Sequence, residues 1–286
     1  MEDCGFGDFN IAIVGVGLIG GSYAMALKNL NTGCIIGVDN NLKTLHKALD
    51  MNIIDHGYDK PGEFLKNIDI IIVSLYPKDT VEFIRENMKY FKTGVIITDT
   101  SGVKKVVVDS VDSFLPETFE FVAGHPMAGR EYKGIEYADG SIFKDANYII
   151  TPGTKSNRKG IELITLMAQK LGCKNVECIS PEEHDRIIAY TSQLPHAIAT
   201  ALLGSRMENV NSELFVGGSF KDSTRVAMIN SKLWTELFVL NSKDLSDGIE
   251  RFQKVLSRIK NDIDNKNTGD LAEMFEDAMI QAKKIH

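Results

Sequence analysis

Between residues 9 and 151, short apolar runs rich in β-branched residues alternate with segments long enough to form helices. This alternation is typical of parallel strands joined by helical crossovers. The run at residues 70–73 is apolar at every position, which suits a strand covered on both faces. The sequence therefore predicts an α/β fold with a doubly wound sheet. The expected strands are 9–14, 34–38, 68–75, 95–98, 119–122 and 148–150.

After about residue 180 the pattern becomes helical. Ser180, Pro181 and Glu183 supply a capping serine, a proline at the first helical position and a glutamate three residues after the cap, so a helix is expected to begin there. Pro195 falls inside that helix and is expected to kink it, a defect that often marks a functional site. We therefore expect two domains, the sheet in residues 1–179 and an all-α domain in residues 180–286.

Apolar residues recur at spacings of three and four in residues 249–263 and again in residues 271–285. This spacing predicts two long helices joined by the turn at residues 267–269. An internal helical hairpin and a homodimer interface explain the pattern equally well.

The composition argues against several classes of protein. A net charge of −7 and a pI near 5.5 argue against a nucleic-acid partner, because binding to phosphates needs a clustered excess of Lys and Arg. The cysteines show no CxxC spacing and follow no secretory leader, so neither a disulfide framework nor a metal site is indicated, and the cytoplasm is the expected compartment. No apolar stretch approaches the roughly 18 residues that a membrane span needs.

The loop at residues 15–20 reads Gly-Val-Gly-Leu-Ile-Gly and directly follows an expected strand. In this setting Gly15 can make the tight turn, Gly17 can admit a pyrophosphate, and Gly20 can let helix and strand pack closely. Leu18 and Ile19 would open the helix whose amino terminus faces the phosphates. The loop therefore predicts a dinucleotide bound to a Rossmann-type domain.

Asp39 ends the second expected strand, 19 positions after Gly20. A carboxylate there would bond the adenosine ribose hydroxyls and repel a 2′-phosphate, and the neighbours Asn40 and Asn41 supply no arginine to offset its charge. NAD is therefore favoured over NADP. The alternative, Asp39 as the cap of a helix at residues 40–49, is compatible with the same geometry.

Ligands of open α/β sheets bind outside the carboxyl ends of the strands. On the expected strands, those ends present Ser74, the pair Asp99 and Ser101, and a loop that contains His125. Ser74 and Asp99 are candidate cofactor contacts. His125 lies between a glycine and a proline, so the loop could hold its imidazole rigidly beside a nicotinamide. A purely structural histidine is the alternative.

When a hydride leaves a carbinol carbon, the hydroxyl proton must leave too, and a neutral histidine with a pKa near ~6.5 suits that task. We therefore predict that His125 is the general base. His46 is expected on a solvent-facing helix, His56 in a loop and His286 at the terminus, so they are weaker candidates.

In the second half of the chain, Ser192 and His196 are four residues apart at the proline kink and so share a helix face. Arg225 is expected in an early turn of a helix, where its guanidinium could clamp a substrate carboxylate. A surface arginine paired with a nearby carboxylate is the alternative. Trp234, the only tryptophan, is expected to serve packing.

Together these residues resemble those of the prephenate and arogenate dehydrogenases of tyrosine biosynthesis. No single matching segment is unique to that family, but their order along the chain is highly specific. The matching segments are residues 15–20, 99–104, 124–129 with Glu131, 194–196, and 217–225 followed by Trp234.

The resemblance implies an amino-terminal dinucleotide domain and a carboxyl-terminal helical dimerisation domain, with prephenate held between them. The family residue that matches His125 accepts the proton of the ring hydroxyl during hydride transfer. Those that match His196 and Arg225 hold the substrate, Arg225 by a carboxylate, and Glu131 matches a glutamate near the substrate entrance. The implied reaction is NAD-dependent oxidative decarboxylation of prephenate to 4-hydroxyphenylpyruvate, driven by aromatisation.

Two positions depart from the family pattern. Many relatives place a serine that orients the catalytic histidine one position before Val-Lys; here that position is Gly102, and the serine is Ser101, which we keep as a catalytic candidate. Relatives also often have histidine where Gln193 stands. Arg130 and Ser192 complete the predicted substrate contacts. No appended regulatory or chorismate mutase domain is expected, so tyrosine inhibition would act at the active site.

Three alternatives to a prephenate dehydrogenase stay open. Arogenate dehydrogenase is the nearest, because its substrate differs only in an amine that replaces the side-chain keto group. A 3-hydroxyacid dehydrogenase could share the glycine loop, but its catalytic lysine or histidine would be expected on the helices after the sheet. A module that binds NAD without turnover has no need of both His125 and Arg225.

Overall fold

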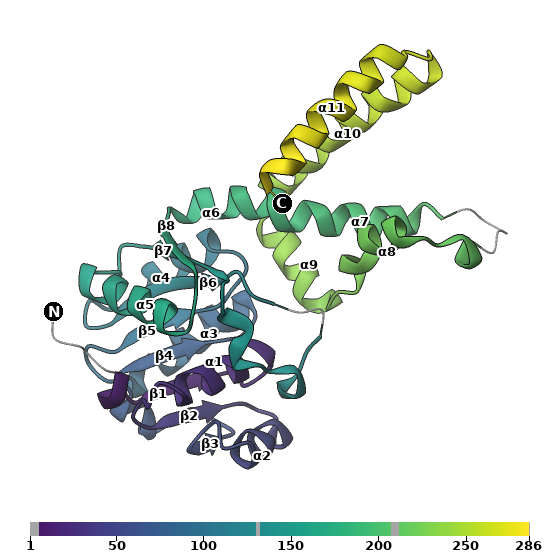
Figure 1. The fold of residues 1–286 in the computed structure, drawn as a ribbon. Coiled ribbons are helices and arrows are strands. Elements are labelled where there is room, and N and C mark those ends of the chain that lie inside the picture. Colours follow the sequence, from purple (N-terminus) through teal and green to yellow (C-terminus); the bar gives the residue numbers. More distant parts are fainter. Residues whose placement is uncertain (1–5, 130–131, 207–211, 286) are drawn as a thin grey trace. The chain divides into compact units, whose positions relative to one another are not determined.

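The computed structural model describes residues 6–129, 132–206 and 212–285 (Figure 1). By contact the chain divides into two compact units, residues 1–241 and residues 242–286, and the first contains the whole sheet. The expected fold class, a doubly wound sheet followed by an all-α part, is confirmed. Among the described residues, none of the helices combines the length and apolarity that a membrane crossing requires.

Eight strands form one sheet in the order β3-β2-β1-β4-β5-β6-β7-β8. All neighbouring strands run parallel except β6 and β7, which are antiparallel. That pair corrects the prediction of parallel strands: the described part of the connection between them holds only short 3₁₀ turns, and a parallel crossover usually needs a helix. The strands are β1 (Ile11–Val14), β2 (Ile35–Val38), β3 (His56–Tyr58), β4 (Ile70–Val73), β5 (Ile96–Asp99), β6 (Glu120–Pro126), β7 (Asn147–Pro152) and β8 (Asn175–Cys178).

The two edge strands, β3 and β8, were not predicted. β3 contains His56, which was expected in a loop, and three of the four residues of β8 are exposed. An edge strand needs little apolar surface, so no apolar run marks it in the sequence.

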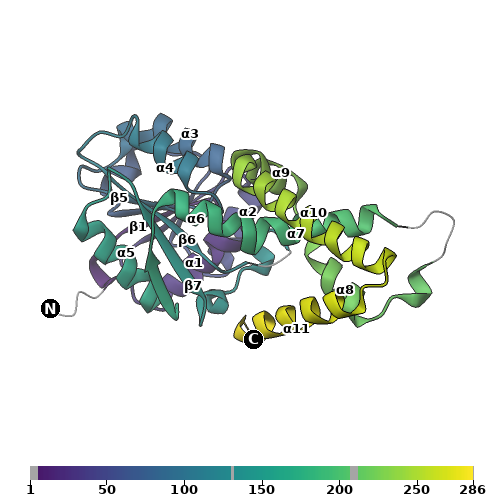
Figure 2. The same ribbon diagram turned by 90° about the horizontal axis from the view of Figure 1, so that it is seen from above.

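Helices cover both faces of the sheet (Figure 2). On β1, Ile11 and Ile13 pack with residues of α1 (Leu18–Lys28), α2 (Leu42–Asp50) and α5 (Arg158–Lys170). Ala12 and Val14 alternate with them and pack with α3 (Pro77–Asn87) and α4 (Lys105–Asp112). The 3₁₀ turns are η1 (Phe6–Asp8), η2 (Glu63–Asn67), η3 (Met88–Tyr90), η4 (Ile135–Tyr137), η5 (Gly140–Phe143), η7 (Ser212–Phe215) and η8 (Arg225–Ala227).

The helix expected at residue 180 begins there. Its first segment, α6 (Pro181–Ile188), is capped by the Ser180 hydroxyl, which accepts from the Glu183 N–H at 3.1 Å. A π-helical turn, η6 (Ala189–Gln193), follows and leads into α7 (Leu194–Gly204), with Pro195 in the first turn of α7. The wider turn accommodates the proline, which has no N–H to donate.

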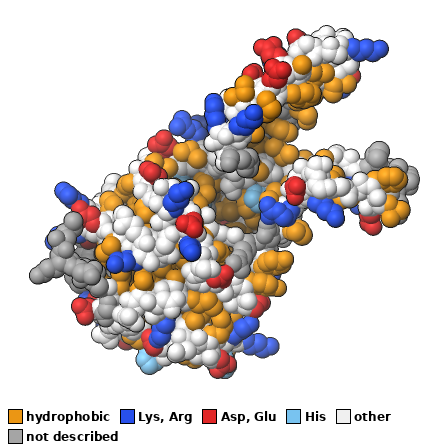
Figure 3. All heavy atoms as spheres, viewed as in Figure 1, with side chains coloured by type: hydrophobic (Ala, Val, Ile, Leu, Met, Phe, Trp, Pro, Cys, Tyr) orange, Lys and Arg blue, Asp and Glu red, His pale blue; other side chains and the backbone are white. Residues whose placement is uncertain are grey.

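Two further helices, α8 (Gly218–Thr224) and α9 (Ser231–Leu240), complete the first unit. The second unit consists of α10 (Ser242–Asp264) and α11 (Thr268–Ile285), the two predicted long helices, which pack on each other. Apolar side chains gather along this hairpin (Figure 3). The large exposed ones are Val255, Leu256, Ile263, Phe275, Met279, Ile280 and Ile285.

Candidate active site

The glycine loop between β1 and α1 has a backbone that only glycine allows at two positions. Gly15 has φ +84°, and a Cβ there would lie 2.4 Å from the Ser74 carbonyl oxygen. A Cβ on Gly20 would lie 1.9 Å from the Gly15 carbonyl oxygen. A Cβ on Gly17, in contrast, would meet no described atom within 4 Å, so the loop leaves open space there. These are the properties that a pyrophosphate cradle requires.

The amino terminus of α1 fits the same ligand. α1 begins at Leu18, followed by Ile19, and no side chain of the described residues caps it. Its first N–H groups can therefore receive a phosphate.

Asp39 is bonded to the glycine loop rather than to a helix. Its Oδ2 accepts from the Val16 N–H at 2.9 Å, and its Oδ1 accepts from the Asn41 N–H at 2.9 Å. Helix α2 is capped by Asn41, whose side chain accepts from the Lys43 N–H. The alternative that Asp39 caps this helix is therefore wrong, and the half-buried carboxylate stands beside the cradle, where a ribose would lie.

Of the other two predicted cofactor contacts, Ser74 lies directly after β4, and its hydroxyl accepts from the Thr100 hydroxyl at 3.3 Å. Asp99 differs from expectation because its carboxylate is fully buried at 0% exposure. Its oxygens accept from the Lys104 ammonium, the Gly124 N–H and the Ser101 N–H. The Asp99 side chain therefore faces the protein interior, so only its main chain is left to contact a cofactor.

His125 lies inside β6, where it pairs with Ile149 of β7, and not in a loop after the strand as expected. The strand therefore extends further than its apolar run, because the antiparallel partner β7 continues the ladder through this position. Being held in a sheet fixes the direction of the imidazole more firmly than a loop would.

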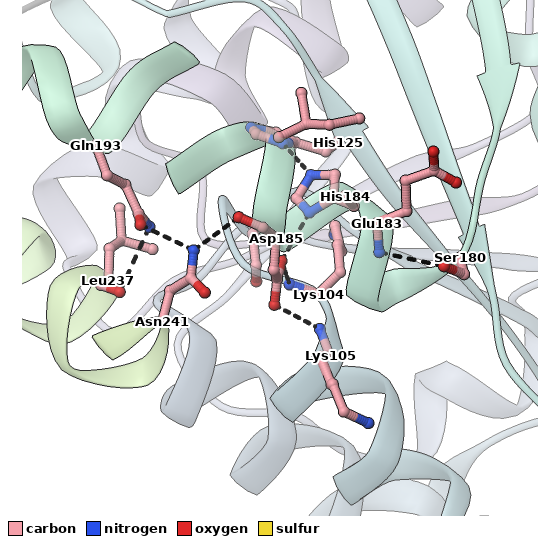
Figure 4. A network of polar contacts seen from close by, with 12 residues as sticks. Lys104, Lys105, His125, Ser180, Glu183, His184, Asp185, Gln193, Leu237 and Asn241 are labelled. Carbon is pink, nitrogen blue, oxygen red and sulfur yellow. Dashed lines mark hydrogen bonds and ion pairs between the residues drawn. The ribbon is translucent and has the colours of Figure 1, made fainter. Parts of the chain in front are cut away.

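Two side chains, those of His184 and Asp185, form a relay behind His125 (Figure 4). Its Nδ1 lies 2.8 Å from Nε2 of His184, and Nδ1 of His184 lies 2.7 Å from Oδ1 of Asp185. A carboxylate only accepts, so we assign the proton of neutral His184 to Nδ1 and its lone pair to Nε2. Nδ1 of His125 must then carry a proton, which leaves the lone pair on its Nε2.

Asp185 also anchors α4. Its Oδ1 accepts from the Lys104 N–H at 2.7 Å and its Oδ2 from the Lys105 N–H at 2.9 Å, although it is 80 or 81 residues away in the sequence. Since no side chain of α4 itself caps that helix, Asp185 does so from α6. The amide of Asn241 in turn donates to the Asp185 main-chain carbonyl and to Gln193 Oε1, both at 2.9 Å.

Burial and two positively charged or titratable neighbours keep His125 neutral. Burial lowers the pKa of His125 well below its usual value, and the neighbouring His184 and Lys104 lower it further. Burial also lowers the pKa of His184, although Asp185 works in the opposite direction. A neutral imidazole with its lone pair at Nε2 can accept a proton.

The space in front of Nε2 is bordered by Gly102. A Cβ at this position would lie 4.0 Å from His125 Nε2 and 3.5 Å from a methyl group of Leu237. The Ser101 hydroxyl is buried and has no hydrogen-bond partner among the described residues. Nδ1 of His125 is held by His184, and a catalytic role for Ser101 stays a prediction.

The predicted substrate residue His196 stacks on Trp234, with ring centroids 3.6 Å apart and an interplanar angle of 27°. Its Nδ1 lies 2.7 Å from the main-chain carbonyl of Ser192, so the two residues meet as their spacing suggested. Phe238 closes on Trp234 edge to face, at 5.8 Å. Trp234 therefore serves packing, as expected, and the residue it packs against is His196, which is predicted to bind the substrate.

Arg225 is not in an early turn of a following helix. It directly follows α8 and opens the 3₁₀ turn η8, and α9 begins only at Ser231. The segment before it, expected as a loop, is itself helical. Residues 218–224 are mostly polar or small and none of them is buried, so no apolar periodicity marks this helix in the sequence. Its guanidinium is exposed. The predicted contacts Arg130 and Glu131 lie outside the described residues.

Sequence reasoning missed the rest of the relay. His184 and Asp185 stand side by side in the second turn of a clearly capped helix, and this His-Asp pair was the available signal. Lys104 and Asn241 carried no signal, because only the tertiary structure buries them.

Comparisons with known proteins agree on one family. Residues 23–177 match the family model of the prephenate dehydrogenase nucleotide-binding domain, and residues 180–277 match that of the prephenate dehydrogenase dimerization domain. The chain is 30% identical to the prephenate dehydrogenase of Bacillus subtilis, over 94% of this chain and 74% of that protein. It is 28% identical to the cyclohexadienyl dehydrogenase of Zymomonas mobilis, over 94% of this chain and 93% of that protein.

Solved structures give the same result. The chain is similar to prephenate dehydrogenase from Aquifex aeolicus in complex with hydroxyphenyl propionate and NAD+, with a TM-score of 0.90 and 31% identity over 97% of this chain and 98% of that one. Synechocystis arogenate dehydrogenase shares the fold, with a TM-score of 0.83 at 23% identity over 97% and 100% of the two chains.

Proposed function

The chain belongs to the prephenate dehydrogenase family, and on this basis we propose that it catalyses the NAD-dependent oxidative decarboxylation of prephenate to 4-hydroxyphenylpyruvate. The observation that carries the proposal is the relay from Asp185 through His184 to His125, which leaves a lone pair on His125 Nε2. Such a base is what the removal of a hydroxyl proton requires.

His125 would accept the proton of the ring hydroxyl at Nε2 while the hydride leaves the same carbon. The new imidazolium would keep its Nδ1 hydrogen bond to His184, whose own Nδ1 proton is held by the Asp185 carboxylate. The anionic Asp185 would thus stabilise the positive charge that develops on His125, without a second proton transfer. When the ring carboxylate leaves as carbon dioxide, the electron pair of the broken C–C bond makes the ring aromatic. The ring oxygen, which is a carbonyl after hydride transfer, would take the proton back from His125 and become the phenol hydroxyl of the product.

Residues Gly15, Gly17 and Gly20, the first turn of α1 and Asp39 would hold NAD, whose nicotinamide ring supplies the hydride acceptor when bound. The open space over Gly17 and the uncapped amino terminus of α1 suit its pyrophosphate. The Asp39 carboxylate suits a ribose and disfavours a 2′-phosphate.

His196 and Arg225 would hold the dianionic substrate, and Arg225 would bind a carboxylate. The stacking of Trp234 on His196 supports this, because an aromatic face holds the imidazole in one orientation. Contacts of Ser192, Arg130 and Glu131 with the substrate stay predictions.

Arogenate is the second candidate substrate. The chain is similar to a cyclohexadienyl dehydrogenase over 93% of that protein, and this similarity is the reason to test arogenate as well. Purified protein should be assayed for NADH formation with each substrate, and kcat/KM compared. A higher value for prephenate supports the proposal, a higher value for arogenate assigns the alternative, and no NADH with either substrate refutes both.

We further propose a homodimer that forms through α10 and α11. The match of residues 180–277 to a dimerization domain and the exposed apolar side chains of the hairpin support this. Light scattering should give twice the mass of 31.7 kDa, and a charged residue in place of Phe275, which is 62% exposed, should reduce it to the monomer. A domain boundary at residues 179 and 180 and a cytoplasmic location stay predictions.

A further inference from the structure

Lys104 is fully buried, at 0% exposure, and the mechanism above does not use it. Its ammonium donates to Oδ1 of Asp99, at 2.7 Å, and to the main-chain carbonyl of Gly124. Asp99 Oδ1 also accepts from the Gly124 N–H, at 3.2 Å. The ion pair therefore binds both the carbonyl and the N–H of Gly124, the residue directly before His125.

Tyr148 packs closely against Gly124 and limits its movement. A Cβ there would lie 2.3 Å from the hydroxyl oxygen of Tyr148, which packs over the glycine from β7. The peptide that leads into His125 is thus held by Lys104, Asp99 and Tyr148 together.

The main chain of Lys104 is tied to the second histidine of the relay. Its N–H donates to Oδ1 of Asp185, the same oxygen that lies 2.7 Å from Nδ1 of His184. One residue therefore holds the peptide before His125 through its side chain and, through its main chain, the Asp185 carboxylate that orients His184. Figure 4 shows the second of these links.

We propose that Lys104 is a positioning residue for the reaction, which sets the geometry between His125 and His184 and disfavours a positive charge on His125 in the free enzyme. The inference rests on the proposed function, because it takes His125 as the base. Stability alone does not explain a lysine at this position, since a well-packed apolar pair is often as stable as a buried ion pair.

The charge of Lys104 acts on His125 together with a small set of neighbours. His184 contacts the imidazole from α6, and Lys104 acts on it from the start of α4. Each of the two is bonded to a carboxylate, His184 to Asp185 and Lys104 to Asp99. His184 and Lys104 lower the pKa of His125, in the same direction as burial. Removal of the ammonium should therefore raise that pKa.

The test uses Lys104→Met and the double variant Asp99→Asn with Lys104→Met. Single replacement leaves the Asp99 carboxylate buried without its partner, which can prevent folding. In the double variant the side-chain amide oxygen introduced by Asp99→Asn can still accept from the Gly124 N–H, so the pair is neutral. Of the two charges that are removed, only that of Lys104 is a cause of the lowered pKa of His125, so a change in that pKa reports the loss of the ammonium. Lys170→Met, an exposed lysine at the end of α5, is the matched control.

Two readouts are needed, and the first does not depend on turnover. The ring proton of His125, followed by NMR in the free enzyme, should titrate at higher pH in the double variant than in the wild type. Second, kcat should fall by about 10²-fold, as for small misplacements of catalytic groups, with an unchanged KM for NAD. The acid limb of the kcat profile should move to higher pH.

An unshifted His125 titration, or a kcat within about two-fold of the wild type in the folded double variant, would overturn the role of Lys104. These results differ from failure of the proposed function. In that case the wild type itself would turn over neither prephenate nor arogenate, while the titration of His125 would still report on Lys104.

Discussion

Nδ1 of His125 and Nε2 of His184 lie 2.8 Å apart, with the two rings at an interplanar angle of 62°. His125 lies on strand β6, and His184, 59 residues later, lies on α6, the first helix after the last strand of the sheet. Because His184 is itself bonded to Asp185, the pair has one arrangement of protons, and the reactive nitrogen of His125 is Nε2.

Replacement of His125 by asparagine should lower kcat by about 10²-fold or more, because the general base is lost. NAD binding, measured by fluorescence titration, should stay unchanged, since the glycine loop is intact. His46→Asn, on the exposed face of α2, is the control and should behave like the wild type. Normal turnover by His125→Asn would remove the residue from the mechanism.

Asp185→Asn should lower both stability and turnover. An amide in place of the carboxylate no longer specifies the tautomer of His184, so we expect kcat to fall by about ten-fold or more. The lost cap of α4 should cost about 1 kcal/mol of unfolding free energy. Chemical denaturation and steady-state kinetics measure the two effects, with the exposed Asp109→Asn on α4 as control. A stability loss with full kcat would make Asp185 a cap only.

Arg225→Ala should raise the KM for prephenate about ten-fold or more with a smaller effect on kcat, because a carboxylate contact made before and during the reaction is removed. Arg225→Lys should recover only part of the affinity, since lysine lacks the bidentate fork. Lys221→Ala, an exposed lysine on α8, provides the control. If the KM for prephenate does not change, Arg225 has no part in substrate binding.

Asp39→Asn should weaken the preference for NAD. The amide can still accept from the Val16 N–H, so the loop should persist, but the charge that repels a 2′-phosphate is gone. We expect the ratio of kcat/KM for NAD to that for NADP to fall about ten-fold. Asp50→Asn at the exposed end of α2 is the control, and an unchanged ratio would place cofactor selection elsewhere.

The free energy of unfolding should depend on pH through the two histidines. Burial lowers the pKa of His125 and of His184, so as the pH falls below ~6.5 the unfolded chain takes up protons first and the folded state loses stability. Each group contributes a slope of up to about 1.4 kcal/mol per pH unit in that range and none above it. Urea titrations at several pH values should show a smaller slope for His184→Asn. An equal slope in both proteins would contradict the assignment.

Features that depend on short windows of sequence could be predicted. The glycine loop, the apolar strands beside it and the cap at Ser180 are each set by main-chain requirements or by periodicity within a few residues, and each lies where it was expected. The same holds for the two long helices α10 and α11. His125 could be selected because its neighbours, a glycine and a proline, mark the end of a strand.

The relations between distant residues were decided by the tertiary structure. Three such relations are the antiparallel pairing of β6 with β7, the contact of His184 with His125, and the cap that Asp185 places on α4. Each joins segments that are far apart in the sequence, and no local pattern predicts that they meet. Burial works in the same way: Asp99 appeared to be a cofactor contact until the fold placed Lys104 against it. By itself the sequence determined which groups are available for chemistry. Only the packing of α6 against the sheet determined their proton arrangement, because pKa and tautomer depend on neighbours in space.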